Sequence, residues 1–228
     1  MTANKTLPVD AATMFGRLKA TYPDAHCELD FANPFQLLIA TVLSAQSTDV
    51  GVNKVTPILF ARCENPAALA AIDRAELEDI IKPTGFFRQK AASLQGIAEV
   101  LLHDFDGQVP TSIEQLTSLP GVGRKTANVV RGHAFGLPGI TTDTHVMRVA
   151  RRLGWTTSDK PLVVESAMAT LFDEPDWTLL SDVVIFHGRR CCHAKKPACG
   201  ACPLADMCPS FGAGPTDFDE ARGLVKAG

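Results

Sequence analysis

The sequence lacks several features that mark whole classes of protein. Among its 228 residues, no run approaches the ~20 consecutive apolar residues of a membrane-spanning helix. Residues 1–18 contain Lys5, Asp10 and Arg17, so they lack the uninterrupted apolar stretch of a secretion signal. Alternating apolar and polar residues between hairpin turns are also missing, which predicts little β-structure. We therefore expect a helical protein of the cytoplasm with no membrane partner.

A large excess of positive charge, which often marks nucleic-acid-binding proteins, is absent as well, because the formal net charge is −3. The charges are nevertheless segregated along the chain. Between residues 121 and 152, six basic residues accompany a single acid, Asp143, and residues 187–199 include four basic residues and no acid. Charge alone leaves two interpretations open, namely solvated helix faces or a binding surface for a polyanion.

The regular patterns that are present are helical. Asn33-Pro34 and Asn65-Pro66 each place a capping side chain before a proline at the first helical position. Residues 34–42 then form an apolar run that predicts a buried central helix. The length suffices for one large domain or two smaller ones. Residues 211–228 begin with Gly212, Gly214 and Pro215 close together, so we expect a loosely held tail.

A glycine-containing turn separates a short expected helix from a longer one, 124–135. Gly121 and Gly123 permit a tight reversal and allow backbone N–H groups to approach a ligand closely. Successive amides at the start of a helix bind anions, and a DNA phosphate would fit such a site. On these residues alone, a purely structural turn between two helices is an equally good interpretation.

Two residues near this turn are candidates for catalysis. Lys125 lies in the first turn of the expected helix, away from its apolar stripe, and a nucleophilic amine must be neutral. Arg124 and the positive end of the helix dipole both disfavour a charged lysine there. A lysine that only binds phosphate remains the alternative. Asp143 precedes another helical pattern, where it could cap the helix, stabilise positive charge on a reacting sugar, or do both.

Cysteine is unevenly distributed, with five of the seven residues between Cys191 and Cys208. An odd count without a secretion signal disfavours disulfides and favours metal binding. Four thiolates can bind zinc or a [4Fe–4S] cluster, and zinc sites commonly use two Cys-x(2–4)-Cys pairs, whereas one is present here. Cys191 falls outside the spacing and is interpreted as a free thiol. The four candidate ligands have a 6-2-5 spacing: Cys192, Cys199, Cys202 and Cys208.

These segments together resemble the endonuclease III family of helix-hairpin-helix DNA glycosylases, over roughly Pro23 to Pro209. The resemblance implies an all-α fold with two domains and DNA in the cleft between them. A helical bundle domain, 27–137, would contain the hairpin at about 116–135. A discontinuous iron–sulfur cluster domain would combine 1–26 with 138–228. The matching segments are 43–49, 85–91, 119–130, 142–145 and the cysteine loop 192–208.

The resemblance implies a bifunctional DNA glycosylase/AP lyase of base excision repair. In that family the lysine matching Lys125 attacks the sugar C1′, and the aspartate matching Asp143 assists. The Schiff base would release an oxidised pyrimidine, and β-elimination would then cut the strand. The cysteine loop would bind a [4Fe–4S] cluster. We expect a monomer that binds double-stranded DNA with damaged bases or abasic sites.

The resemblance also implies a set of DNA contacts. An enzyme that acts on a stacked base must turn the nucleotide out, and the gap must be filled. Gln46 matches a family residue that enters from the minor groove, and Phe86 stands where the family has a smaller apolar wedge. One of Phe86 and Phe87 is expected to pack inward. The implied DNA-contacting residues are Gln46, Phe86, Gly121, Val122, Gly123, Arg124, His145, Lys195 and Lys196.

Three other functions remain as alternatives at this point. A related adenine-specific glycosylase is disfavoured by Lys125, which hydrolysis alone does not need, and by the lack of its C-terminal recognition domain. A non-catalytic DNA-binding module would use the hairpin and the cysteine loop only for binding. A zinc-dependent transcription-type protein would use the four cysteines for zinc.

Overall fold

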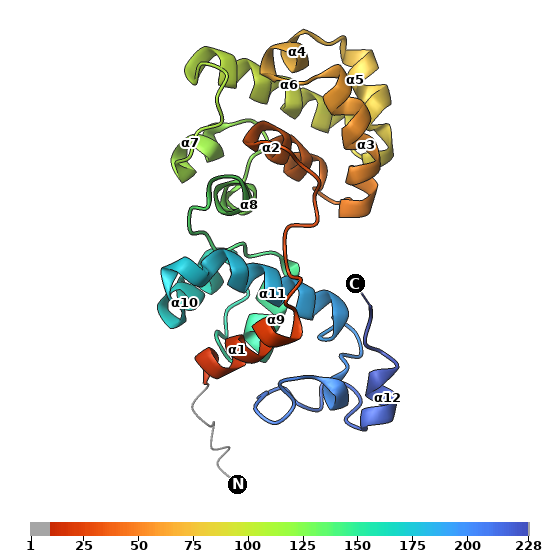
Figure 1. Cartoon of the computed structure of the whole chain (residues 1–228), viewed down its shortest axis with the longest axis vertical. Coiled ribbons are helices and arrows are strands. Elements are labelled where there is room, and N and C mark those ends of the chain that lie inside the picture. Colours follow the sequence, from red (N-terminus) through yellow and green to blue (C-terminus); the bar gives the residue numbers. More distant parts are fainter. Residues whose placement is uncertain (1–9, 228) are drawn as a thin grey trace. The chain divides into compact units, whose positions relative to one another are not determined.

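In the computed structural model, the described residues, 10–227, form helices joined by short turns and one irregular loop region (Figure 1). No β-strand occurs among these residues, which confirms the expected all-α fold. None of the helices in this range is long and apolar enough to cross a membrane. Residues 1–9, including Lys5 and the start of the expected iron–sulfur cluster domain, lie outside the described part.

The chain divides into two compact units. The first, called here the hairpin unit, spans Cys27–Leu137, and the second, called here the split unit, combines residues 10–26 with 138–227. The hairpin unit contains α2 (Pro34–Leu43), α3 (Asp49–Arg62), α4 (Pro66–Ala71), α5 (Arg74–Ile81), the 3-10 helix η1 (Lys82–Thr84), α6 (Phe87–Asp104), α7 (Ile113–Ser118) and α8 (Arg124–Phe135).

The hairpin unit is built around α2, as its apolar run predicts. Leu37, Leu38 and Ile39 are fully buried, and α2 packs against α8 while α4 packs against α6. The caps form as expected, because Asn33 Oδ1 accepts a hydrogen bond from Gln36 N at 2.9 Å. Asn65 caps α4 in the same way, with Pro66 at its first position.

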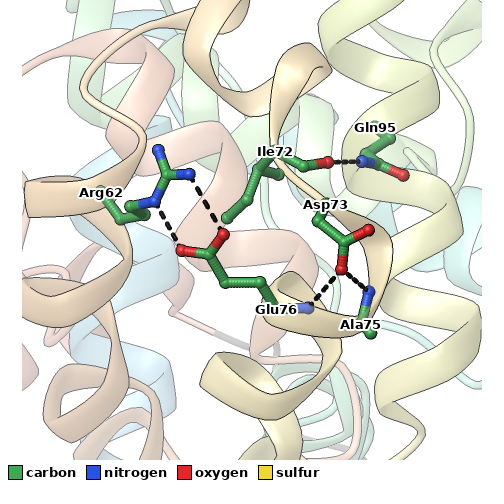
Figure 2. Close-up of polar contacts among 6 residues, drawn as sticks. All are labelled: Arg62, Ile72, Asp73, Ala75, Glu76 and Gln95. Atoms are coloured by element: carbon green, nitrogen blue, oxygen red, sulfur yellow. Dashed lines mark hydrogen bonds and ion pairs between the residues drawn. The ribbon is translucent and has the colours of Figure 1, made fainter.

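Polar contacts connect α3, α5 and α6 at one side of this unit (Figure 2). Asp73 caps α5 by accepting hydrogen bonds from two backbone amides, Ala75 N and Glu76 N. The Glu76 carboxylate pairs with Arg62 of α3 through two nitrogens, at 2.5 and 3.1 Å. Gln95 of α6 donates to the carbonyl of Ile72 at 2.8 Å. Short helices are thus anchored at their ends, where intrahelical bonds run out.

The split unit has its own apolar core, in which α9 packs against α11 and α1 also packs against α11. Its buried aromatic side chains include Phe15, Trp155 and Phe172, which meet edge to face. The unit contains α1 (Ala11–Thr21), α9 (Thr144–Arg152), α10 (Pro161–Leu171), η2 (Glu174–Asp176), α11 (Trp177–Arg190), η3 (Cys199–Ala201) and α12 (Phe218–Arg222).

The expectation of a loosely held tail is wrong. The chain after residue 211 runs back along the cysteine loop, where Gly200 N donates to Pro215 O at 2.9 Å. It then forms α12, whose Ala221 is fully buried against Cys191 and Ala198 (Figure 1). Gly and Pro in this stretch allow close backbone contact between the two segments instead of marking disorder.

Candidate functional site

The hairpin turn joins α7 to α8 through Gly121, whose φ of 74° requires the left-handed region that glycine tolerates. A Cβ added to Gly121 would lie 2.8 Å from Ser93 Oγ of α6, so the turn is also packed tightly against that helix. Val122 is buried, and its amide donates to Leu119 O at 3.1 Å inside the turn. Val122 therefore contributes packing and turn closure to the hairpin.

The start of α8 presents the candidate nucleophile. Gly123 precedes the helix without a side-chain cap, and Gly123, Arg124 and Lys125 are all exposed. Ala127 and Val130, on the apolar stripe, are fully buried. An uncapped helix start with exposed basic side chains has the features of an anion-binding site. The exposed position of Lys125 confirms that it points away from the stripe.

Backbone strain coincides with several predicted DNA contacts. Among the described residues, the non-glycine positions with positive φ are Gln46, Phe86, Asp106 and Lys196. All but Asp106 belong to the predicted DNA-contacting set. Strained backbone persists where the surrounding structure enforces it, and such residues cluster at functional sites. Sequence patterns give little warning of this conformation, because none of these residues is a glycine.

The two phenylalanines of 85–91 divide as expected. Phe86 is 63% exposed at a φ of 47°, directly before α6. Phe87 is half-buried and packs against the apolar core of the hairpin unit. Gln46, in the turn between α2 and α3, is likewise exposed. An exposed aromatic side chain on a fixed backbone is the form that an intercalating wedge requires.

In the split unit, Asp143 caps α9. Its Oδ1 accepts a hydrogen bond from Val146 N at 2.8 Å, and the residue is half-buried. His145, two residues on, contacts Arg148 Nη2 through Nδ1 at 3.1 Å. Gly188 of α11 permits this packing, because a Cβ there would lie 2.9 Å from His145 Cβ. The capping role weighed for Asp143 is therefore confirmed, and it leaves the carboxylate at the exposed start of the helix.

Two arginines of α9 hold the beginning of the cysteine loop. Arg148 Nε donates to Cys192 O at 3.1 Å, and its Nη2 donates to Gly188 O at 2.9 Å. Arg152 Nη1 donates to Cys192 Sγ at 3.3 Å and to His193 O at 2.6 Å. These contacts satisfy carbonyls of an irregular segment that no helix or sheet could satisfy. The sequence gives no spacing rule for them, so both roles were missed.

The cysteine loop encloses a cavity lined by all five clustered cysteines together with Arg152 and His187. His187 is fully buried on α11, where its Nδ1 lies 3.0 Å from Tyr22 Oη. Ligand atoms of His187, Cys191 and Cys202 lie within 4.8 Å of one another. His187 is a third residue that sequence reasoning missed.

The electrostatics of the loop favour thiolates at Cys192 and Cys202, whereas burial raises the pKa of Cys208 to about 11. Burial acts to raise the pKa of Cys192, but hydrogen bonds from His187 and Arg152 outweigh it and hold that pKa below its usual range. A hydrogen bond from Cys191 and a further one from His187 lower the pKa of Cys202. The same contact with Cys202 raises the pKa of Cys191. That Cys191 is a free thiol outside the ligand set stays a prediction. Thiolates that face one cavity fit a bound metal cluster.

Comparison with known proteins shows which protein families share these features. The family model of HhH-GPD superfamily base excision DNA repair proteins matches residues 39–174. The iron–sulfur binding domain of endonuclease III matches residues 192–208, which is the cysteine loop. Fold and site thus define a helix-hairpin-helix protein of base excision DNA repair.

Individual relatives narrow the assignment. Endonuclease III of Synechocystis sp. is 53% identical over 194 residues, which cover 85% of this chain and 89% of the relative. An endonuclease III solved in a non-covalent complex with DNA is 43% identical, with a TM-score of 0.84 over 88% of this chain and 94% of that one. Another, solved as a trapped covalent intermediate with DNA, is 42% identical, with a TM-score of 0.86 over 90% and 97%.

The chain belongs to the endonuclease III family, which confirms the resemblance found in the sequence. It is therefore a DNA glycosylase with AP lyase activity that acts in base excision repair, and its cofactor is the family's [4Fe–4S] cluster. The adenine-specific, non-catalytic and zinc-dependent alternatives are set aside by the same matches.

Proposed function

We propose that Lys125 is the nucleophile that releases oxidised pyrimidines from double-stranded DNA. The observation that supports this role is an exposed lysine in the first turn of α8, directly after the hairpin turn. Its relatives include an endonuclease III trapped in a covalent intermediate with DNA. An amine that forms such a bond must be both exposed and held close to the DNA backbone, and the start of α8 meets both requirements.

In the proposed reaction, the Lys125 amine attacks C1′ of the flipped nucleotide. A C–N bond forms as the glycosidic bond breaks, and the base leaves with the bonding electron pair and takes up a proton. Loss of one amine proton lets the nitrogen lone pair open the sugar ring, whose O4′ takes up a proton, and this gives a protonated Schiff base. That cation acidifies the C2′ proton, so its removal expels the 3′ oxygen and cuts the strand. Water then releases the lysine.

Asp143 is proposed to assist this reaction. A carboxylate stabilises the positive charge that develops at C1′ and can accept a proton from the attacking amine. Its capping bond to Val146 N uses one carboxylate oxygen and fixes the orientation of the side chain. Capping and catalysis are therefore compatible in one residue.

The proposed DNA contacts divide by chemistry. Gly121, Gly123 and Arg124 bind the phosphate backbone at the hairpin, Val122 supports the turn, and His145 contacts DNA from the start of α9. Gln46 and Phe86 fill the gap left by the flipped nucleotide. Lys195 and Lys196, both exposed on the cysteine loop, pair with further phosphates.

We further propose that Cys192, Cys199, Cys202 and Cys208 are the ligands of the [4Fe–4S] cluster. All four line one cavity, and the contacts of Arg152 and His187 favour thiolates at Cys192 and Cys202. When bound, the cluster closes the loop and couples its folding to metal binding. We also propose that the protein works as a monomer in the cytoplasm.

The roles of Lys125 and Asp143 are tested together in single turnovers on a duplex that contains thymine glycol, with borohydride trapping on abasic duplex. Lys125→Gln should abolish trapping and base release while binding to abasic DNA persists. Asp143→Asn should keep the helix cap, because Asn caps as well as Asp, yet slow base release about 100-fold or more. Melting temperatures of both variants should stay close to that of the parent.

Lys54→Gln is the matched control, since it removes an exposed lysine from α3 of the same unit. It should trap and excise like the parent protein. Undiminished trapping by Lys125→Gln would assign the nucleophile elsewhere. A parent protein that forms trapped complexes but releases no oxidised pyrimidine would contradict the proposed substrate class alone.

A further inference from the structure

Gln46 and Phe86 lie in different loops of the hairpin unit, yet one buried side chain contacts the backbone next to both. We infer that Lys90 is a positioning residue that holds the Gln46 loop and the Phe86 loop in one fixed arrangement, so that both side chains can enter the DNA together. The inference rests on the gap-filling role proposed for Gln46 and Phe86.

Lys90 is the fourth residue of α6, and the residue is only 6% exposed. Its Nζ donates one hydrogen bond to Leu43 O at 2.8 Å and another to Thr84 O at 2.7 Å. Its backbone N–H donates to Phe86 O at 3.0 Å. A single residue therefore binds three carbonyls, all of them from the segments that lead into or form the two loops.

Each of the two carbonyls that accept from Lys90 Nζ stands where a helix ends and a loop with a predicted DNA contact begins. Leu43 is the last residue of α2, and Gln46 follows three positions later with a φ of 54°. Thr84 is the last residue of η1, and Phe86 follows two positions later with a φ of 47°. Because both carbonyls bond the same nitrogen, neither loop can shift independently without breaking one of these hydrogen bonds.

A lysine is energetically unfavourable at a buried position whose only role is packing. Burial lowers the pKa of Lys90, since the charged ammonium loses its hydration, and the start of α6 is the positive end of a helix dipole. Its two side-chain acceptors are carbonyls rather than carboxylates. An apolar side chain would fill the same space at lower cost. What the ammonium adds is two directed hydrogen bonds at once.

These bonds also explain how the strained conformations persist. A non-glycine residue in the left-handed region is strained, so it relaxes unless neighbouring bonds fix the backbone on either side. At Phe86 the fixing bonds come from Lys90, with Nζ on Thr84 O and N–H on Phe86 O. At Gln46 the same ammonium fixes the end of α2.

The test compares Lys90→Met, which keeps an unbranched side chain of nearly the same length without the ammonium group, with Lys54→Met as a matched surface control. Single-turnover excision is measured on a thymine glycol duplex, and 2-aminopurine opposite the lesion reports insertion into the gap by its fluorescence. Lys90→Met should slow excision about 10- to 100-fold and reduce the fluorescence change, because misplaced groups lose rate steeply. The [4Fe–4S] absorbance and borohydride trapping at single-stranded abasic sites, which need no gap filling, should be unchanged.

A double-mutant cycle separates positioning from general weakening. Lys90→Met is combined with Gln46→Ala and Phe86→Ala together. If Lys90 acts through these two residues, adding Lys90→Met to the alanine pair should change excision less than twofold. Losses that multiply, or a normal fluorescence change in Lys90→Met, would overturn the inference. Should Lys90→Met fold poorly, the same cycle is run with Lys90→Arg, which keeps the charge but places its donors differently.

The outcome also distinguishes this inference from its premise. If the alanine pair excises as fast as the parent protein, the proposed gap-filling role of Gln46 and Phe86 fails. If the alanine pair is impaired and Lys90→Met is not, the gap-filling role stands and the positioning role of Lys90 is wrong.

Discussion

The two units satisfy the hydrogen-bonding groups of their backbones in different ways. In the hairpin unit, capped helices with apolar stripes surround α2, and the turns between them are short. In the split unit, the segment 191–217 has little regular structure, and two arginine side chains of α9 donate to carbonyls at its beginning. The contrast teaches that caps and helical periodicity specify most of the first unit, whereas the irregular segment of the second depends on long-range side-chain bonds and a bound group.

Removal of one thiolate should have the largest effect, and it should fall on one unit. Cys199→Ser replaces a buried ligand candidate in the cysteine loop, so we expect loss of the visible cluster absorbance and low soluble yield. Proteolytic cuts should concentrate within 191–217, while fragments that contain 27–137 persist. Iron content and mass spectrometry of a limited digest measure both. Equal proteolysis of both units would show that their stabilities are not separable.

A smaller effect is expected from the hairpin turn, in the opposite unit. Gly121→Ala forces a left-handed φ on an alanine and places a Cβ 2.8 Å from Ser93 Oγ, so we expect a loss of about 1–3 kcal/mol in the free energy of unfolding. Gly123→Ala is the matched control, since a Cβ there meets nothing within 4 Å. It should lose below about 1 kcal/mol, through weaker capping.

Denaturant unfolding followed by helical circular dichroism measures both glycine variants, and the cluster absorbance should be retained in each. A loss in Gly123→Ala as large as that in Gly121→Ala would mean that the turn does not depend on the left-handed glycine.

The smallest effect concerns a single charge on the cysteine loop. Lys196→Ala should keep the cluster and weaken binding to abasic duplex, and the slope of log K against log salt should fall by about 0.9, as expected for one lost phosphate contact. Lys160→Ala, which removes an exposed lysine before α10, serves as the control. Titrations from low to moderate salt decide the matter. An unchanged slope in Lys196→Ala would mean that this lysine makes no phosphate contact and only faces solvent.

Much of the fold followed from local chemistry. Asn33 and Asn65 predicted the starts of two helices, and the apolar run of 34–42 predicted the central helix, because caps and periodicity act over a few residues. The glycine turn and the 6-2-5 cysteine spacing could be recognised in the sequence for the same reason. The tail was misread, because Gly and Pro mark flexible chain and close backbone packing alike.

The supporting residues of the site were not predictable from one sequence. Arg148, Arg152, His187 and Lys90 act on groups brought close only by tertiary folding, such as Leu43 O near Lys90 Nζ. Lys90 in particular has the appearance of an ordinary surface lysine at a helix start. Long-range contacts between side chains and carbonyls produce no periodic pattern in the sequence, so only the folded chain shows them.

The close fit between the tail and the cysteine loop makes the two segments depend on each other. Gly200 and Gly214 lie where a Cβ would collide with backbone of the other segment, at Thr216 and Pro197. A side chain at either glycine would therefore push residues 213–217 away from the cysteine loop, so a change in the tail is also a change in the surroundings of the cysteines.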